Sequence, residues 1–143
     1  MNRRPWAPRP RAGDIVECRF PESEVGTPGP KDRPALVVQV EQDPEDESAS
    51  IVRVAYGTSQ DVEQRYPGEL TVRATDPKAG LDRDTKFDLG NTVRLPFDTE
   101  WFAPSPNRRF GVHPKRGILH LKDEKLKRAL QAAILEAKEA GRL

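Results

Sequence analysis

The sequence is poor in the residues that build thiol and metal sites. Its 143 residues include one cysteine and two histidines. The single thiol, Cys18, has no intramolecular disulfide partner, and one sulfur with two imidazoles is too little for a zinc site unless carboxylates complete it. No cofactor-binding motif stands out either. We therefore expect a protein that holds no metal ion and no cofactor.

Long apolar runs and an excess of one charge are also missing. Apolar residues make up 35% of the chain and charged residues 33%, and the net charge is +1 at pH 7. No apolar stretch approaches the about 20 residues of a membrane-spanning helix, and none follows the N-terminal arginines as it would in a signal peptide. A nearly neutral chain has no overall attraction to nucleic acid. We expect a cytoplasmic protein without membrane contact.

The chain lacks several well-known catalytic motifs. It has no glycine-rich phosphate loop that ends in Lys-Ser/Thr, and no G-x-S-x-G nucleophile turn. His113 lies beside a proline in "GVHPKRG", and His120 lies among apolar residues in "ILHL". Neither has a nucleophile at a suitable spacing, so we interpret both as structural or surface histidines rather than catalytic ones.

Proline and glycine, by contrast, are plentiful, with 14 and 10 residues. They indicate short elements joined by turns rather than a helix bundle. Residues 1–12, "MNRRPWAPRPRA", combine prolines with arginines, and we predict that they form an extended basic arm. We expect residues 13–143 to form a single domain. Strand patterns occur in "GDIVECRF", "RPALVVQV", "IVRVAYG", "ELTVRA" and "TKFDLGNTVRLPF".

The C-terminal segment changes to a helical period. Its regularly spaced apolar residues are Leu126, Leu130, Ile134 and Ala137. Asp123 can cap the start of a helix and Gly141 can end it, so we predict a helix at residues 123–140. Short strands with one amphipathic helix favour a mainly β fold, a small and strongly bent antiparallel sheet or barrel against which the helix packs.

Polar residues stand at the ends of two strong strand candidates. Arg33 begins "RPALVVQV", and Thr58, Ser59 and Gln60 follow "IVRVAYG". If these strands form a hairpin, Arg33 and Thr58 face one another at one end of the sheet. A guanidinium beside hydroxyls can bind a phosphate and stabilise the charge of a transition state. A structural arginine bonded to loop carbonyls is the alternative, and on the pattern alone it is the stronger one.

Charge is unevenly distributed along the rest of the chain. The insertion-like stretch 98–117 contains Arg108 and Arg109 beside Phe110, which could contact an RNA backbone and stack on a base. Solvated loops are the alternative interpretation. Residues 41–47, "EQDPEDE", are acidic and would repel RNA if they lay near the site.

Taken in order, four segments resemble the MazF/PemK toxin family. They are "GDIVECRFP", "KDRPALVV", "AYGTSQ" and "AGLDRDTKFDLGNTVRLP". The similarity covers about residues 12–140, and the order and spacing of these short pieces carry it more than any one piece. The resemblance implies an SH3-like, strongly bent antiparallel barrel with a C-terminal helix, which usually assembles as a homodimer.

The resemblance also implies a function. Members of this family are the toxin half of bacterial type II toxin–antitoxin pairs, and they are typically metal-independent endoribonucleases. The 2′-OH of single-stranded RNA, mRNA above all, attacks the phosphate and leaves a 2′,3′-cyclic phosphate and a 5′-OH. The implied partners of this chain are therefore a single-stranded RNA substrate, a cognate antitoxin protein and a second copy of itself.

The family's site residues can be placed on this sequence one by one. The arginine of its R-P-A motif falls on Arg33, and its Thr/Ser after the next strand falls on Thr58, with Ser59 beside it. Its loop acid has Glu24 as the nearest match, although the loop from Glu24 to Arg33 is longer than in compact members. The general base stays open between Glu24, water and the phosphate. Expected RNA contacts are Lys31, Gln60, Arg108 and Arg109.

Two alternative functions remain at this point. The same barrel could be a non-catalytic toxin that targets DNA gyrase, because a fold does not fix a function. The chain could also be an inactive relative that binds RNA or regulates.

Overall fold

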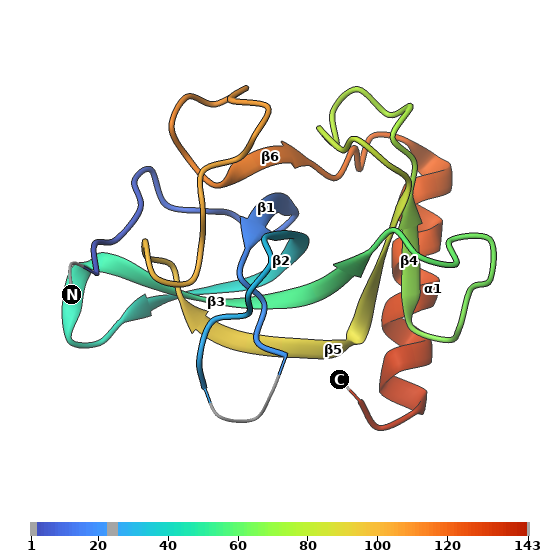
Figure 1. The fold of residues 1–143 in the computed structure, drawn as a ribbon. Coiled ribbons are helices and arrows are strands. Elements are labelled where there is room, and N and C mark those ends of the chain that lie inside the picture. Colours follow the sequence, from blue (N-terminus) through green and yellow to red (C-terminus); the bar gives the residue numbers. More distant parts are fainter. Residues whose placement is uncertain (1–2, 23–25, 143) are drawn as a thin grey trace.

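The computed structural model describes residues 3–22 and 26–142. Its elements, in chain order, are β1 (Asp14–Cys18), β2 (Arg33–Asp43), β3 (Asp46–Thr58), β4 (Glu69–Val72), β5 (Thr85–Pro96), β6 (Lys115–Ile118) and α1 (Glu124–Glu139) (Figure 1). The mainly β fold with a C-terminal helix, predicted from the strand and helix periods, is confirmed. One short strand, β6, was not predicted; it covers "KRGI" at the end of the insertion-like stretch 98–117.

The strands form one six-stranded sheet in the order β4-β5-β3-β2-β1-β6, and each neighbouring pair is antiparallel. Within the described residues β4 and β6 are its edges, so the sheet is bent but open. The bend in β5 has a local cause. Ala55 of β3 lies opposite Thr92, whereas the next residue, Tyr56, lies opposite Asp88. The extra residues of β5 at this point bulge and turn the strand, which Figure 1 shows running from β4 to lie along β3.

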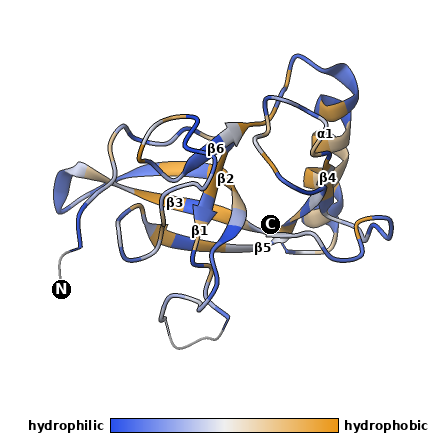
Figure 2. Cartoon of the chain, turned by 45° about the horizontal axis from the view of Figure 1, so that its top comes forward, coloured by the Kyte–Doolittle hydropathy of each residue, from blue (hydrophilic) through white to orange (hydrophobic). Residues whose placement is uncertain are grey.

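Both faces of the sheet are covered, and each carries a hydrophobic core. All residues of β1 are buried, because the strand lies between the two cores. Its Ile15 points into the core that contains the helix residues Ala133 and Ala137, and its Val16 points into the core around Phe97 and Phe102. Figure 2 shows the resulting alternation of hydrophobic and hydrophilic residues along the strands and the helix.

Helix α1 lies between the capping residues that the sequence predicted. The carboxylate of Asp123 accepts a hydrogen bond from the backbone N–H of Lys125 at 3.0 Å, and Gly141 adopts the left-handed φ of +70° just beyond the helix. Small residues face the sheet, so the helix lies close against β4 and β5 (Figure 1).

The described part of the N-terminal arm is docked rather than free. The indole N–H of Trp6 donates to the Phe102 carbonyl at 3.0 Å, and Arg3 pairs with Asp98 and Glu100. Trp6 therefore packs against the core around Phe97 and Phe102. Residues 3–8 and the stretch that begins at Asp98 hold each other in place over one side of the sheet.

Candidate functional site at the ends of β2 and β3

The hairpin of β2 and β3 brings Arg33 and Thr58 to the same end of the sheet. Ala35 pairs with Tyr56, so the first residue of β2 lies beside the last residue of β3. A hollow of about 240 Å³ opens there, and Arg33, Thr58 and Ser59 all line it. The strands approach unusually closely beneath it: a Cβ at Gly57 would lie 2.3 Å from the Pro34 carbonyl oxygen. Gly57 thus permits the close pairing that places the two side chains together.

Arg33 presents its charge at the rim of this hollow. The guanidinium lies over the Tyr56 ring, 5.8 Å from the ring centroid, and its Nη2 is 3.7 Å from a Glu22 carboxylate oxygen. The Arg33 side chain is 29% exposed, so an anion from solution can reach it. The contact with Tyr56 orients the head group, while the long ion pair with a half-exposed glutamate is too weak to hold it tightly.

Thr58 is held with its hydroxyl available as a donor. Its Oγ1 accepts a hydrogen bond from the backbone N–H of Gln60 at 3.1 Å. A hydroxyl that accepts one such bond can still donate its own proton, which a phosphate oxygen would accept. Ser59 is exposed beside it and adds a second hydroxyl to the same wall.

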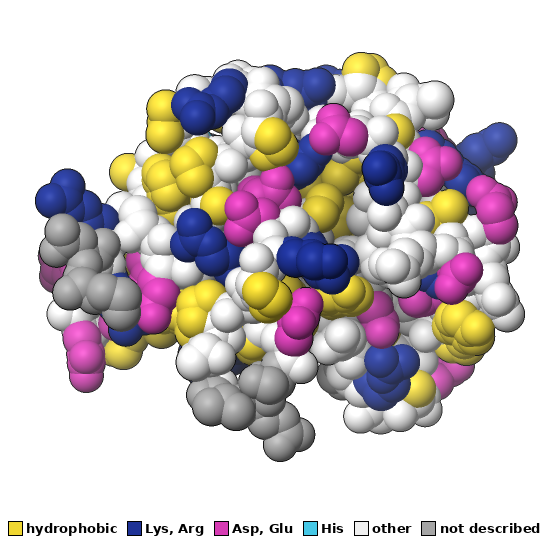
Figure 3. Space-filling model, viewed as in Figure 1, with side chains coloured by type: hydrophobic (Ala, Val, Ile, Leu, Met, Phe, Trp, Pro, Cys, Tyr) yellow, Lys and Arg dark blue, Asp and Glu magenta, His cyan; other side chains and the backbone are white. Residues whose placement is uncertain are grey.

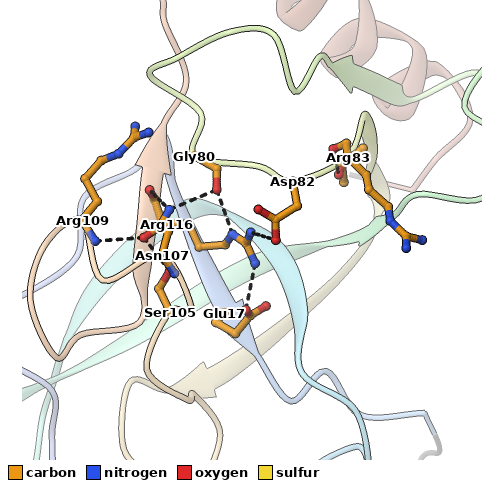
Figure 4. Close-up of polar contacts among 9 residues, drawn as sticks. Glu17, Gly80, Asp82, Arg83, Ser105, Asn107, Arg109 and Arg116 are labelled. Atoms are coloured by element: carbon orange, nitrogen blue, oxygen red, sulfur yellow. Dashed lines mark hydrogen bonds and ion pairs between the residues drawn. The ribbon is translucent and has the colours of Figure 1, made fainter.

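Four further charged residues of this hollow were missed from the sequence, and one of them, Asp32, directly precedes β2. Asp82 and Arg83 come from the loop before β5, and Arg116 comes from β6. The guanidinium of Arg116 is buried and donates to Glu17 at 2.9 Å and to Asp82 at 3.2 Å (Figure 4). Arg116 and Glu17 are 99 positions apart, so no local pattern could have indicated the pair.

Glu17 is an ionisable group that burial perturbs strongly. Its side chain is 6% exposed, and removal from water raises the pKa of Glu17 above its ordinary value of 4.5. The Arg116 guanidinium lowers that pKa, and the neighbouring charge of Asp32 raises it again, so burial is the larger effect. The hollow therefore sits on a buried ion pair that burial makes costly to form.

Stability should depend on pH through Glu17. Because the pKa is raised in the folded state, native protein binds the proton more tightly than unfolded protein, and this contribution falls as pH rises from 4.5 through the raised value. We expect the stability of wild type, relative to Glu17→Gln, to decrease as the pH rises above about 4.5. Urea unfolding at constant ionic strength, repeated over a series of pH values, measures the difference in the free energy of unfolding between wild type and Glu17→Gln. A difference that is flat or rises with pH would contradict this assignment.

The other expected RNA contacts are not among the residues that line the hollow. Lys31 and Gln60 are exposed next to lining residues. Arg109 borders an adjoining smaller hollow that shares Asp82 with the first, and its guanidinium donates to the Pro77 carbonyl. Arg108 is exposed on the same segment. Glu24 lies outside the described residues, so its position relative to Arg33 stays a prediction.

Charges of both signs surround the site. Figure 3 shows basic and acidic side chains interleaved over the visible face, with no single broad basic patch. The acidic run 41–47 lies at the far end of the β2–β3 hairpin, because β2 separates Asp43 from Arg33 by the length of an 11-residue strand, about 33 Å at ~3.3 Å per residue. The repulsion of RNA by this run is accordingly remote from the hollow.

Within residues 3–22 and 26–142, no group of three or more metal-binding side chains is found. No helix in the same part of the chain is both long and apolar enough to cross a membrane.

The chain is therefore a small, bent β domain with one C-terminal helix, and an arginine and two hydroxyl side chains line a hollow at the end of its central hairpin. The family model of the PemK-like, MazF-like toxin of type II toxin–antitoxin systems matches residues 11–96, and the chain belongs to this family. The matched range covers β1 to β5 and includes Arg33, Thr58 and Asp82, whereas β6 and α1 lie beyond it. The comparison with curated proteins finds no match.

Proposed function

We propose that this toxin is a metal-independent endoribonuclease that cleaves single-stranded RNA, mRNA in particular, at the hollow between β2 and β3. The observation that carries the proposal is the convergence of Arg33 with Thr58 and Ser59 in one solvent-accessible hollow. A guanidinium and hydroxyls there match the charge and the acceptors of a phosphodiester.

The reaction is an internal transfer at phosphorus. The 2′-oxygen attacks the adjacent phosphorus as it loses its proton, the bond from phosphorus to O5′ breaks, and O5′ takes up a proton. The products are a 2′,3′-cyclic phosphate and a 5′-OH. Arg33 stabilises the negative charge that builds on the phosphoryl oxygens, and Thr58 orients the phosphate by a hydrogen bond, with Ser59 in support.

The proton acceptor for the 2′-OH is a carboxylate. Asp82 lines the hollow with a side chain that is 80% exposed, more than the 48% of Asp32, the other carboxylate in the lining. We assign the role to Asp82 ahead of Glu24. We assign the contacts to the flanking backbone of the substrate to four exposed residues, Lys31, Gln60, Arg108 and Arg109, of which Arg109 lines the adjoining hollow.

The family pairs its toxins with antitoxins, so a cognate antitoxin is the partner of this chain, and we propose that it acts by covering the hollow. We further propose that the toxin is a homodimer. Its own assembly can be measured by light scattering or sedimentation without RNA.

Purified protein should cut a single-stranded RNA in the presence of EDTA. We expect product ends with a 2′,3′-cyclic phosphate and a 5′-OH, and no cleavage where the nucleotide before the scissile bond is 2′-deoxy, because the nucleophile is then missing. Gel electrophoresis detects the cleavage, and treatment with end-specific enzymes identifies the product ends. Intact RNA, or cleavage that needs added metal, would refute the proposal, and toxicity without RNA cleavage would point to a protein target such as gyrase.

A further inference from the structure

Arg116 lines the hollow and joins β1 to the loop that carries Asp82. From β6, its Nη1 donates to Glu17 on β1 at 2.9 Å, its Nη2 donates to Asp82 at 3.2 Å, and its Nε donates to the Gly80 carbonyl at 3.1 Å. Figure 4 shows the guanidinium between these partners, with Asp82 beside it. All of its nitrogens are therefore used, each toward a different residue.

The loop that carries Asp82 rests directly on β6. Asn107 donates to the carbonyls of both Gly80 and Arg116, at 3.2 and 3.0 Å, and so ties the loop to the strand (Figure 4). The contact leaves no room for side chains, because a Cβ at Gly80 would lie 2.0 Å from the Arg116 carbonyl oxygen. A backbone N–H of β6, that of Ile118, also donates to the Lys78 carbonyl at 2.8 Å. The position of Asp82 is thus set by β6 rather than by β5, the strand that follows it in the chain.

We infer that Arg116 is a positioning residue that holds the Asp82 carboxylate at the hollow beside Arg33 and Thr58. The inference rests on the proposed function, in which Asp82 accepts the proton of the 2′-OH. Glu17 completes the arrangement: it is buried, accepts from the opposite side of the guanidinium, and fixes its plane. Arg116 itself is 5% exposed and acts through Asp82.

The geometry requires an arginine. A lysine has one compact ammonium on a flexible stem. It cannot donate hydrogen bonds to Glu17, Gly80 and Asp82 at once, because these acceptors lie in different directions around the guanidinium. Arg116→Lys retains the positive charge that Glu17 needs, but it loses the planar fork that reaches the exposed carboxylate. This change tests positioning more selectively than removal of the charge.

A double-mutant cycle separates positioning from a general structural role. We expect Arg116→Lys to lower kcat for RNA cleavage about tenfold, and Asp82→Asn to lower it about 100-fold, with KM little changed in both. If Arg116 acts through Asp82, the double variant should be no slower than Asp82→Asn alone. Arg94→Lys, which alters an exposed ion pair with Glu41 outside the hollow, is the matched control and should cleave as wild type does.

Independent losses that multiply in the double variant would overturn the inference, as would a folded Arg116→Lys that cleaves at the wild-type rate. Circular dichroism establishes folding. If Arg116→Lys does not fold, Glu17→Gln/Arg116→Met takes its place in the cycle, because it removes the guanidinium that contacts Asp82 and leaves no unpaired buried carboxylate. The proposed function fails separately: wild type that does not cut RNA, or Arg33→Ala that cuts normally, refutes the nuclease itself, whereas cleavage that depends on Arg33 but not on Arg116 refutes only the positioning role.

Discussion

Arg33→Ala is expected to lower the rate of RNA cleavage by about 10²–10³-fold, since the guanidinium is the group assigned to the charge that develops on the phosphoryl oxygens. The loss should appear mainly in kcat, because the interaction is stronger in the transition state than with the substrate. Initial rates on a short single-stranded RNA measure kcat and KM.

The fold should survive this change. Arg33 is at the first position of β2, its side chain is partly exposed, and its carboxylate contact with Glu22 is long. We expect thermal unfolding close to that of wild type, and binding of a non-cleavable 2′-deoxy oligonucleotide weakened only modestly. Arg33→Lys, the matched variant, keeps the charge without the fork and should recover part of the rate. Equal rates for wild type and Arg33→Ala would remove Arg33 from the mechanism.

Arg116→Met should have the largest effect on stability. It leaves the buried Glu17 carboxylate without its cation, and breaking a buried pair from one side typically costs about 3–5 kcal/mol in the free energy of unfolding. Urea unfolding near neutral pH measures the loss. It should be smaller in acid, where a protonated Glu17 needs no partner.

The double variant Glu17→Gln/Arg116→Met is the control for this prediction. Without a charge on either side, most of the lost stability should return, because replacement of a whole buried pair is far less costly than removal of half of it. Asp82→Asn, which removes the exposed partner of Arg116, should change stability little, since that side chain is 80% exposed. A double variant as unstable as Arg116→Met alone would show that the lost packing, not the stranded charge, dominates.

Sequence patterns predicted the helix and strands whose stabilising contacts lie within a single segment of the chain. The helix could be predicted because its apolar residues, Leu126, Leu130 and Ile134, and its N-cap all lie in one short segment. Strand β6 was missed, since "KRGI" has no alternation and becomes a strand only by pairing with β1. The N-terminal arm was predicted as extended and basic. Its docking depends on the hydrogen bond from Trp6 to the Phe102 carbonyl, and these residues are 96 positions apart in the sequence.

The residues of the candidate site also differ in whether the sequence could place them. Arg33 and Thr58 could be placed together from the sequence because a single hairpin relates them. Asp82 and Arg116 could not, because their positions depend on a loop that rests on β6 and on a buried partner in β1. The roles of Arg33, Thr58, Ser59 and Glu24 stay predictions until cleavage is measured.

The sequence by itself determined the mainly β fold, the C-terminal helix, the family, and the two strand ends that bear Arg33 and Thr58. These follow from periodicity and from contacts between neighbouring segments, which the order of residues specifies directly. Only the tertiary structure decided that Asp82 lines the hollow and that Arg116, which also lines it, is paired with the buried Glu17. Those facts depend on packing between segments distant in the chain, whose partners no local pattern names.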